Sequence, residues 1–198
     1  MIIWINGAFG SGKTVTAHEL HRRLPDSFVY DPERVGYFIR RNSNGIFSSG
    51  DFQDIPLWRQ MNYQMLKLIN DNFDGIVIVP MTLVNADYFH EIVGRLLSDG
   101  VDLRHFILYA DREVLTKRIK TRALPIIGRT EFALAAIDRC LEAFDNQITE
   151  TRIYNNDIGI DDVVESIAEQ CGLSLAAGRS SSLGRRVFRI RLTLKGLF

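Results

Sequence analysis

Residues 1–14 read MIIWINGAFGSGKT, and this stretch decides the fold. It opens on the apolar run of residues 2–5, which is typical of a buried strand. Residues 7–14 then match the pattern G-x-x-x-x-G-K-[ST] completely. Glycines in this pattern let the backbone curl so that successive N–H groups face phosphate oxygens, and the N-terminus of the next helix adds partial positive charge. We therefore predict a phosphate-binding loop between a strand and a helix, rather than a chance glycine-rich turn.

The loop supplies a complete set of predicted nucleotide contacts. Lys13 is expected to reach the β- and γ-phosphates of ATP, and the hydroxyl of Thr14 is expected to hold Mg²⁺. ATP and Mg²⁺ are thus the predicted cofactors. The predicted nucleotide-binding residues are Gly7, Ala8, Phe9, Gly10, Ser11, Gly12, Lys13 and Thr14.

Composition indicates an ordinary globular chain. Of its 198 residues, 24% are charged and 46% are apolar, which suits one domain with a sizeable core. Basic and acidic residues number 24 each, so we expect no nucleic-acid partner. No leader peptide and no apolar run of roughly 18–20 residues is present, which favours a cytoplasmic protein. Cys140 and Cys171 have no metal or redox spacing, and we expect both to be buried.

Strand and helix patterns alternate five times along the chain, which predicts a five-stranded parallel sheet covered by helices on both faces. This is the three-layer α/β fold of phosphate-loop NTPases, and we assign it to residues 1–172. Ligands bind at the carboxyl ends of such strands. The predicted strands are residues 2–5, 27–31, 75–80, 103–110 and 151–155. Polar residues that follow them, including Asp31, Asp111 and Asn155, should therefore gather at one rim with the loop.

Basic residues on the helix predicted over residues 111–122 are candidates for stabilising a transferred phosphoryl group. Arg118 and Arg122 are four residues apart, on one helix face, and Arg129 lies in the loop that follows. Small kinases close such a segment over ATP, so we predict a lid over about residues 118–135, with Arg118 and Arg122 as catalytic residues. The alternative is a solvated basic helix face.

Asp31 is the candidate to orient or deprotonate an acceptor hydroxyl, because it ends the second predicted strand. The alternative is a helix cap, since Pro32 follows it. Glu33 and Arg34 are weaker candidates for the same site. The third strand ends in Pro80-Met81-Thr82, without the acidic residue that often helps to hold Mg²⁺ in phosphate-loop proteins.

Two further features are compatible with several interpretations. Trp58 and Tyr63 could stack on a base, although aromatic residues at helical spacing more often belong to a core. The tail, residues 173–198, is basic and amphipathic and contains no acidic residue. It can lie on an anionic membrane surface, pack on the body, or form a dimer contact.

The chain resembles the bacterial tunicamycin resistance protein family over residues 1–172. The segments that carry the resemblance are the opening MIIWINGAFGSGKT, HELHRRL, VYDPE, DFQDIPLWRQMNY, IVIVPMTLV, EIVGRL and IDRC. The tail matches only in its basic, amphipathic character. The resemblance implies a fold like that of nucleoside monophosphate kinases, ATP binding by residues 7–14, and protection from tunicamycin, a uracil-containing nucleoside antibiotic.

Three functions remain open at this point. The first is a kinase that phosphorylates tunicamycin or a nucleoside-like compound, with Lys13, Asp31, Arg118 and Arg122 as its catalytic residues. The second is a metabolic nucleotide or small-molecule kinase. The third is a binder that sequesters tunicamycin without chemistry, with the tail at the inner face of the cell membrane.

Overall fold

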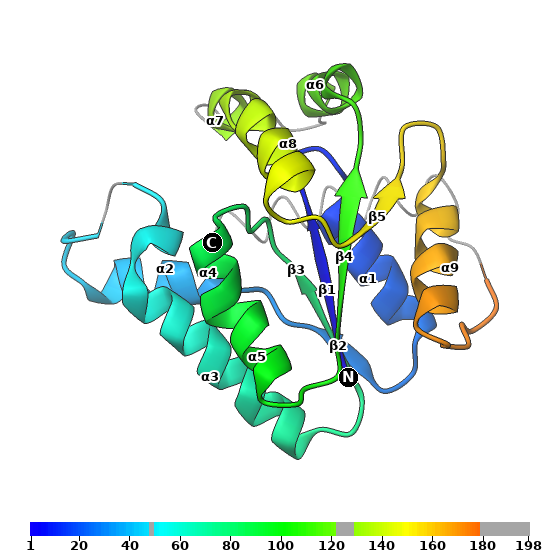
Figure 1. The fold of residues 1–198 in the computed structure, drawn as a ribbon, viewed down its shortest axis with the longest axis horizontal. Helices are drawn as coiled ribbons and strands as arrows, with labels where there is room; N and C mark the ends of the chain where they lie inside the picture. The colour runs from blue at the N-terminus through cyan, green and yellow to red at the C-terminus, as the bar shows by residue number, and fades with distance from the viewer. Residues whose placement is uncertain (48–49, 122–128, 179–198) are drawn as a thin grey trace.

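The computed structural model describes residues 1–47, 50–121 and 129–178, together with the side chains of these residues apart from that of Arg129. Arg122 and the tail from residue 179 onward lie outside the described residues, as does the middle of the predicted lid. The described chain forms one central sheet between layers of helices (Figure 1).

The sheet has five strands in the order β2-β3-β1-β4-β5, and every neighbouring pair is parallel. This confirms the predicted α/β fold. β1 lies at the centre because residues 2–5 are fully buried on both faces. The strands are β1 (Ile2–Gly7), β2 (Ser27–Val29), β3 (Ile76–Pro80), β4 (Leu103–Tyr109) and β5 (Thr151–Tyr154).

Helices connect the strands and cover both faces of the sheet. In Figure 1, α1 and α9 lie on one side of the sheet and α3 and α5 on the other, while α6, α7 and α8 lie beyond the carboxyl ends of the strands. The helical segments are α1 (Lys13–Arg23), α2 (Glu33–Asn42), η1 (Phe52–Asp54), α3 (Pro56–Asn72), α4 (Ala86–Phe89), η2 (His90–Gly94), α5 (Arg95–Ser98), α6 (Arg112–Lys120), α7 (Arg129–Ala135), α8 (Ile137–Asn146) and α9 (Ile160–Gln170).

Alternate residues of β1 enter two separate cores. Ile3 and Ile5 pack with α1 and α9, while Ile2 and Trp4 pack with the helices of the opposite face. Trp4 also donates its indole N–H to the Met81 carbonyl oxygen at 3.3 Å. Because adjacent residues of a strand point to opposite faces, an apolar run of this kind needs a helix layer on each side.

Trp58 belongs to the core, the alternative that its helical spacing favoured over base stacking, and Tyr63 is engaged in contacts within the fold. Trp58 is fully buried in the core and donates its indole N–H to the Pro32 carbonyl at 3.0 Å. Tyr63 donates its hydroxyl to Asp99 at 2.5 Å, and the Arg95 guanidinium lies over its ring at 3.8 Å from the centroid. Both aromatic rings are therefore used in holding α3 within the fold.

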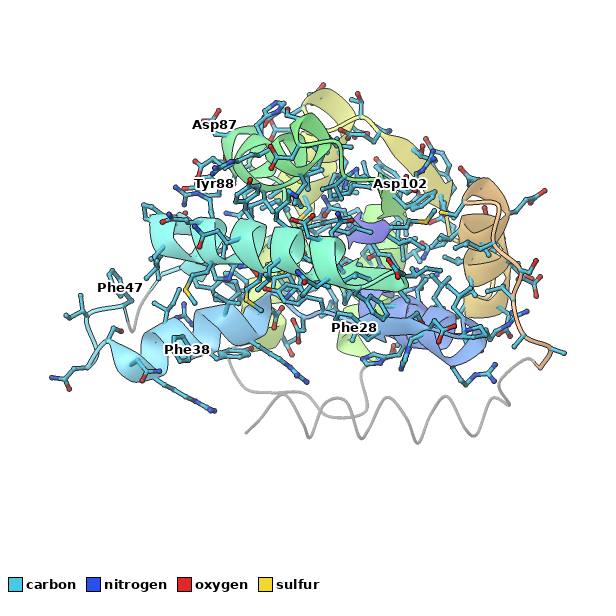
Figure 2. All side chains as sticks on the ribbon, turned by 90° about the horizontal axis from the view of Figure 1, so that it is seen from below. Phe28, Phe38, Phe47, Asp87, Tyr88 and Asp102 are labelled. Carbon is cyan, nitrogen blue, oxygen red and sulfur yellow. The ribbon has the colours of Figure 1, made fainter. Side chains whose placement is uncertain are left out.

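Two exposed aromatic residues, Phe38 and Phe47, lie on α2 and on the loop after it (Figure 2). Their exposed fractions are 57% and 39%. Cys140 is buried as expected, whereas Cys171 is only partly buried. Within the described ranges, no helix combines the length and apolar character needed to cross a membrane.

Candidate functional site

The phosphate loop connects β1 to α1 and has a backbone that requires glycine. Gly7, Gly10 and Gly12 have φ angles of 142°, 86° and 99°. A Cβ atom on Gly7 would lie 2.6 Å from the Leu108 carbonyl oxygen, and one on Gly10 would lie 3.1 Å from the Leu115 carbonyl oxygen. The loop therefore packs directly on β4 and α6, and side chains at these glycines would push it away from both elements.

Lys13 begins α1 and folds back over the loop. Its ammonium group donates to the carbonyl oxygens of Gly7 and Ala8 at 2.8 and 3.0 Å, and lies 5.7 Å from the centroid of the Phe9 ring. This position keeps a positive charge over the concave face of the loop. The Phe9 ring in turn meets Phe132 of α7 edge-on at 5.6 Å, so part of the predicted lid contacts the loop.

Two polar side chains from other strand ends hold the loop. Thr82, just beyond β3, donates its hydroxyl to the Gly7 carbonyl at 2.9 Å. Asn155, just beyond β5, donates its amide to the Ser11 carbonyl at 2.7 Å and is 2% exposed. The predicted gathering of strand-end residues is therefore observed for Thr82 and Asn155.

Arg118 is directed toward the end of β5. Its guanidinium donates to the Asn155 carbonyl at 2.5 Å, the Asn155 side-chain oxygen at 3.3 Å and the Asn156 carbonyl at 3.2 Å. Asn155 accepts from Arg118 and donates to Ser11, so it lies between the guanidinium and the loop. Arg118 is therefore held by hydrogen bonds, unlike a side chain on a solvated basic helix face.

Asp31 follows β2 at the same rim, and β3 lies between β2 and β1 in the sheet. Adjacent strands are about 4.8 Å apart, so the strand that precedes Asp31 lies about 10 Å from the strand that precedes the loop. One carboxylate oxygen accepts from the Glu33 N–H at 3.0 Å, as in the predicted helix cap. Burial raises the pKa of Asp31 above the ordinary carboxyl value, against the lowering influence of that N–H and of the Arg34 guanidinium.

The Mg²⁺ ligands available at the loop are few. Thr14 is exposed in the first turn of α1, and the polar residue at the end of β3 is Thr82 rather than a carboxylate. Among the described residues, no group of three or more His, Cys, Asp or Glu side chains could hold a metal ion. This donor set suits Mg²⁺ bound mainly by phosphate oxygens and water, with one hydroxyl from the chain.

Sequence reasoning missed the residues that connect the loop to η1 and α3. Gln53 in η1 donates its amide to the Thr82 carbonyl at 3.1 Å. Arg59, only 8% exposed, donates to the Gln53 carbonyl at 2.5 Å and to Glu91 at 2.6 Å, and its guanidinium lies 4.1 Å from the centroid of the Tyr88 ring. Figure 2 shows Tyr88 on the outside of this region. Neither Gln53 nor Arg59 belongs to a sequence motif from which such contacts could be predicted.

Comparisons with known proteins agree with this geometry. Residues 2–146 match the sequence profile of a family described as an AAA domain. The structure superposes on the tunicamycin resistance protein of Deinococcus radiodurans with a TM-score of 0.75 and 34% sequence identity, over 89% of this chain and 98% of that chain. No curated protein sequence matches this chain.

Two more distant structures establish the fold. The shikimate kinase from Bacteroides thetaiotaomicron is 16% identical with a TM-score of 0.53, over 87% of this chain and 99% of that one. The deoxyadenosine kinase from M. mycoides is 17% identical with a TM-score of 0.53, over the same shares. The fold is therefore like that of the nucleoside monophosphate kinases, and the phosphate-loop family implies use of a nucleotide. The chain belongs to the AAA domain family and to the family of tunicamycin resistance proteins.

Proposed function

We propose that this chain confers tunicamycin resistance by transferring the γ-phosphoryl group of ATP to a hydroxyl of tunicamycin or a related nucleoside-like compound. The nucleotide phosphates bind to the backbone N–H groups of residues 7–14, and Lys13 exchanges its two carbonyl partners for β- and γ-phosphate oxygens. Mg²⁺ neutralises developing charge on these oxygens when bound, and Thr14 contributes one ligand.

The observation that carries the proposal is a half-buried carboxylate across the rim from the phosphate loop. Asp31 lies about 10 Å from the loop's strand, a span that leaves room for a transferred phosphoryl group and an acceptor hydroxyl. Its raised pKa makes the carboxylate a stronger base than an exposed aspartate. In this proposal Asp31 accepts the proton that the hydroxyl oxygen loses as its bond to phosphorus forms.

Arg118 and Arg122 complete the proposed charge stabilisation. Arg118 donates to the carbonyl of Asn155, whose side chain in turn donates to Ser11 of the loop, and in this proposal it exchanges these partners for phosphate oxygens. We assign Arg122 to the same role by its spacing of four residues. Residues 118–135 act in this proposal as a lid that excludes water from the transferred group.

The proposed acceptor follows from the 34% identity to the tunicamycin resistance protein of D. radiodurans, and the phosphoryl transfer from the site itself. The test is mass spectrometry of tunicamycin after incubation with the protein, Mg²⁺ and ATP. We expect a product heavier by one phosphoryl group, lost with Lys13→Ala and strongly reduced with Asp31→Asn. Asp51→Asn is the matched control, because Asp51 accepts a hydrogen bond from the backbone N–H two residues on, as Asp31 does.

One observation favours a second candidate, ATP-dependent sequestration of tunicamycin. β3 ends at Pro80, and neither it nor Met81 and Thr82 beyond it provides a carboxylate for the metal. In this alternative the nucleotide stabilises a closed form, and the tail from residue 179 onward contacts the inner face of the membrane. Unchanged tunicamycin, together with protection proportional to the amount of protein, would support it and contradict the kinase. Turnover of a common metabolite, without turnover of tunicamycin, would indicate a metabolic kinase.

A further inference from the structure

Asn6 is the last residue before the glycine-rich loop, and its side chain is fully buried. Its carboxamide oxygen accepts from the backbone N–H of Gly7 at 2.8 Å and from that of Leu83 at 3.0 Å. Its amide nitrogen donates to the Leu83 carbonyl at 2.8 Å and lies 3.2 Å from Nε2 of His105. One side chain therefore joins the first loop residue, the chain beyond β3, and a histidine of β4.

The protonation state of His105 follows from these contacts. Two backbone N–H groups point at one atom of the Asn6 carboxamide, so that atom is its oxygen and the other is its NH₂ group. The NH₂ group can only donate, so Nε2 of His105 must accept. A neutral imidazole that accepts at Nε2 carries its proton on Nδ1.

The surroundings of His105 suit this tautomer. Its side chain is 4% exposed, and Nδ1 lies 3.5 Å from a carboxylate oxygen of Glu150, whose side chain is 42% exposed. The Phe89 ring meets the imidazole at 4.9 Å between centroids and 66° between planes, which restricts rotation of the ring. Within the described residues Nδ1 makes no hydrogen bond, so the tautomer is assigned from the Asn6 contact at Nε2.

Other charged or titratable groups lie near His105 and Glu150. His90, at the start of η2, interacts with Glu150. Arg104 lines a surface cavity of about 300 Å³ together with His105 and Glu150, and it pairs with Asp102 at 3.1 Å.

We propose that His105 is a positioning residue for the phosphate loop, which acts by accepting a hydrogen bond from Asn6 and thereby fixing the Gly7 N–H. The inference rests on the proposed nucleotide binding. Without an acceptor at residue 105, the Asn6 amide would be free to rotate and would release Gly7 and Leu83 together. Nucleotide affinity should therefore fall when that acceptor is removed.

The first test measures the dissociation constant of a fluorescent ATP analogue at neutral pH. We expect His105→Leu to bind the analogue about three- to tenfold more weakly than wild type, because a variant without the acceptor loses about one hydrogen bond. His105→Gln, whose carboxamide oxygen can accept from Asn6, should restore the affinity. His90→Gln is the control and should behave as wild type.

The second test needs no nucleotide and examines the wild-type protein. Long-range ¹H–¹⁵N correlation spectra of the imidazoles should show His105 with Nδ1 protonated and Nε2 unprotonated at neutral pH, and His105→Gln serves only to assign its signals. A proton on Nε2, or equal nucleotide affinity in wild type and His105→Leu, would overturn the inference. Failure of the wild-type protein to bind nucleotide would instead contradict the proposed function.

Discussion

The phosphate loop and residues 31–59 at the same rim, which we propose as the acceptor side, differ in the backbone that their contacts need. In the loop, three glycines have positive φ angles, and the carbonyl oxygens of Gly7 and Ser11 accept from the side chains of Thr82 and Asn155. On the acceptor side, Gln53 and Arg59 also donate from side chains to backbone carbonyls, but neither residue has a positive φ angle. A loop that needs glycine at fixed positions tolerates few substitutions but suits any ligand with phosphates, whereas side chains on ordinary backbone can change with the substrate.

The largest expected effect lies on the loop side. Lys13→Ala removes the ammonium group that lies over the loop, and we expect phosphoryl transfer to fall roughly 10²- to 10³-fold, as when one transition-state donor is lost. Lys67→Ala is the control, because Lys67 is bound to Asp71 at 2.6 Å on α3. The measurement is the initial rate of product formation at saturating ATP. Equal rates for Lys13→Ala and wild type would show that the lysine of the loop does not contribute to phosphoryl transfer.

The backbone of the loop provides the second prediction. Gly7→Ala puts a Cβ atom 2.6 Å from both the Leu108 carbonyl and the Ser11 hydroxyl, at a φ of 142°. We expect a loss of about 2–4 kcal/mol in the free energy of unfolding, from backbone strain and overpacking together. Gly45→Ala has a similar constraint, with φ at 82°, but nothing within 4 Å of the new atom. It should lose about 1 kcal/mol in the same denaturant titration. Similar losses would indicate that the close packing of Gly7 contributes little.

The contrast between the two regions also explains how much the sequence could predict. The loop and the inner strands β1, β3 and β4 are encoded locally, by a fixed glycine spacing and by apolar runs that are mostly buried. The edge strands β2 and β5 are less buried. All five strands were predicted close to their observed bounds. The helix cap at Asp31 was among the alternatives for the same reason, since an aspartate before a proline is a local signal.

The contacts of Gln53 and of Asn6 could not be predicted in this way, because they join residues far apart in the chain. Gln53 meets Thr82 across 29 positions, and Asn6 meets His105 across 99. The spacing of Trp58 on α3 suited a core more than a ligand, and the structure shows it fully buried. Interactions of this range depend on strand order, which the sequence pattern left open.

Arg59 provides the third prediction, on the acceptor side. Arg59→Leu removes its bonds to Gln53 and Glu91, and we expect a loss of about 1–3 kcal/mol in unfolding free energy. If the side-chain network shapes the acceptor wall, KM for the acceptor should rise while affinity for ATP stays unchanged. Arg104→Leu is the control, since its pair with Asp102 is half exposed and its loss should change stability by less than about 0.5 kcal/mol. A parallel loss of ATP affinity in Arg59→Leu would show that the two regions are coupled through Thr82.

The smallest expected effect concerns the stability cost of Asp31 itself. Because burial raises its pKa in the folded protein, the protonated form is favoured by folding, and the stability it contributes is lost as the pH rises through the folded pKa. Asparagine resembles the protonated acid and can still accept from the Glu33 N–H, so Asp31→Asn should melt at a slightly higher temperature than wild type at pH 7. The difference should close below about pH 4, where the aspartate is protonated in both folded and unfolded chains.

Asp51→Asn removes a negative charge from a similar hydrogen-bonding geometry, and an equal gain in that variant would show that burial of Asp31 is not the cause. A variant that gains stability while losing phosphoryl transfer would identify Asp31 as a group kept at a cost to the fold, which is the expected signature of a residue retained for chemistry rather than for capping α2.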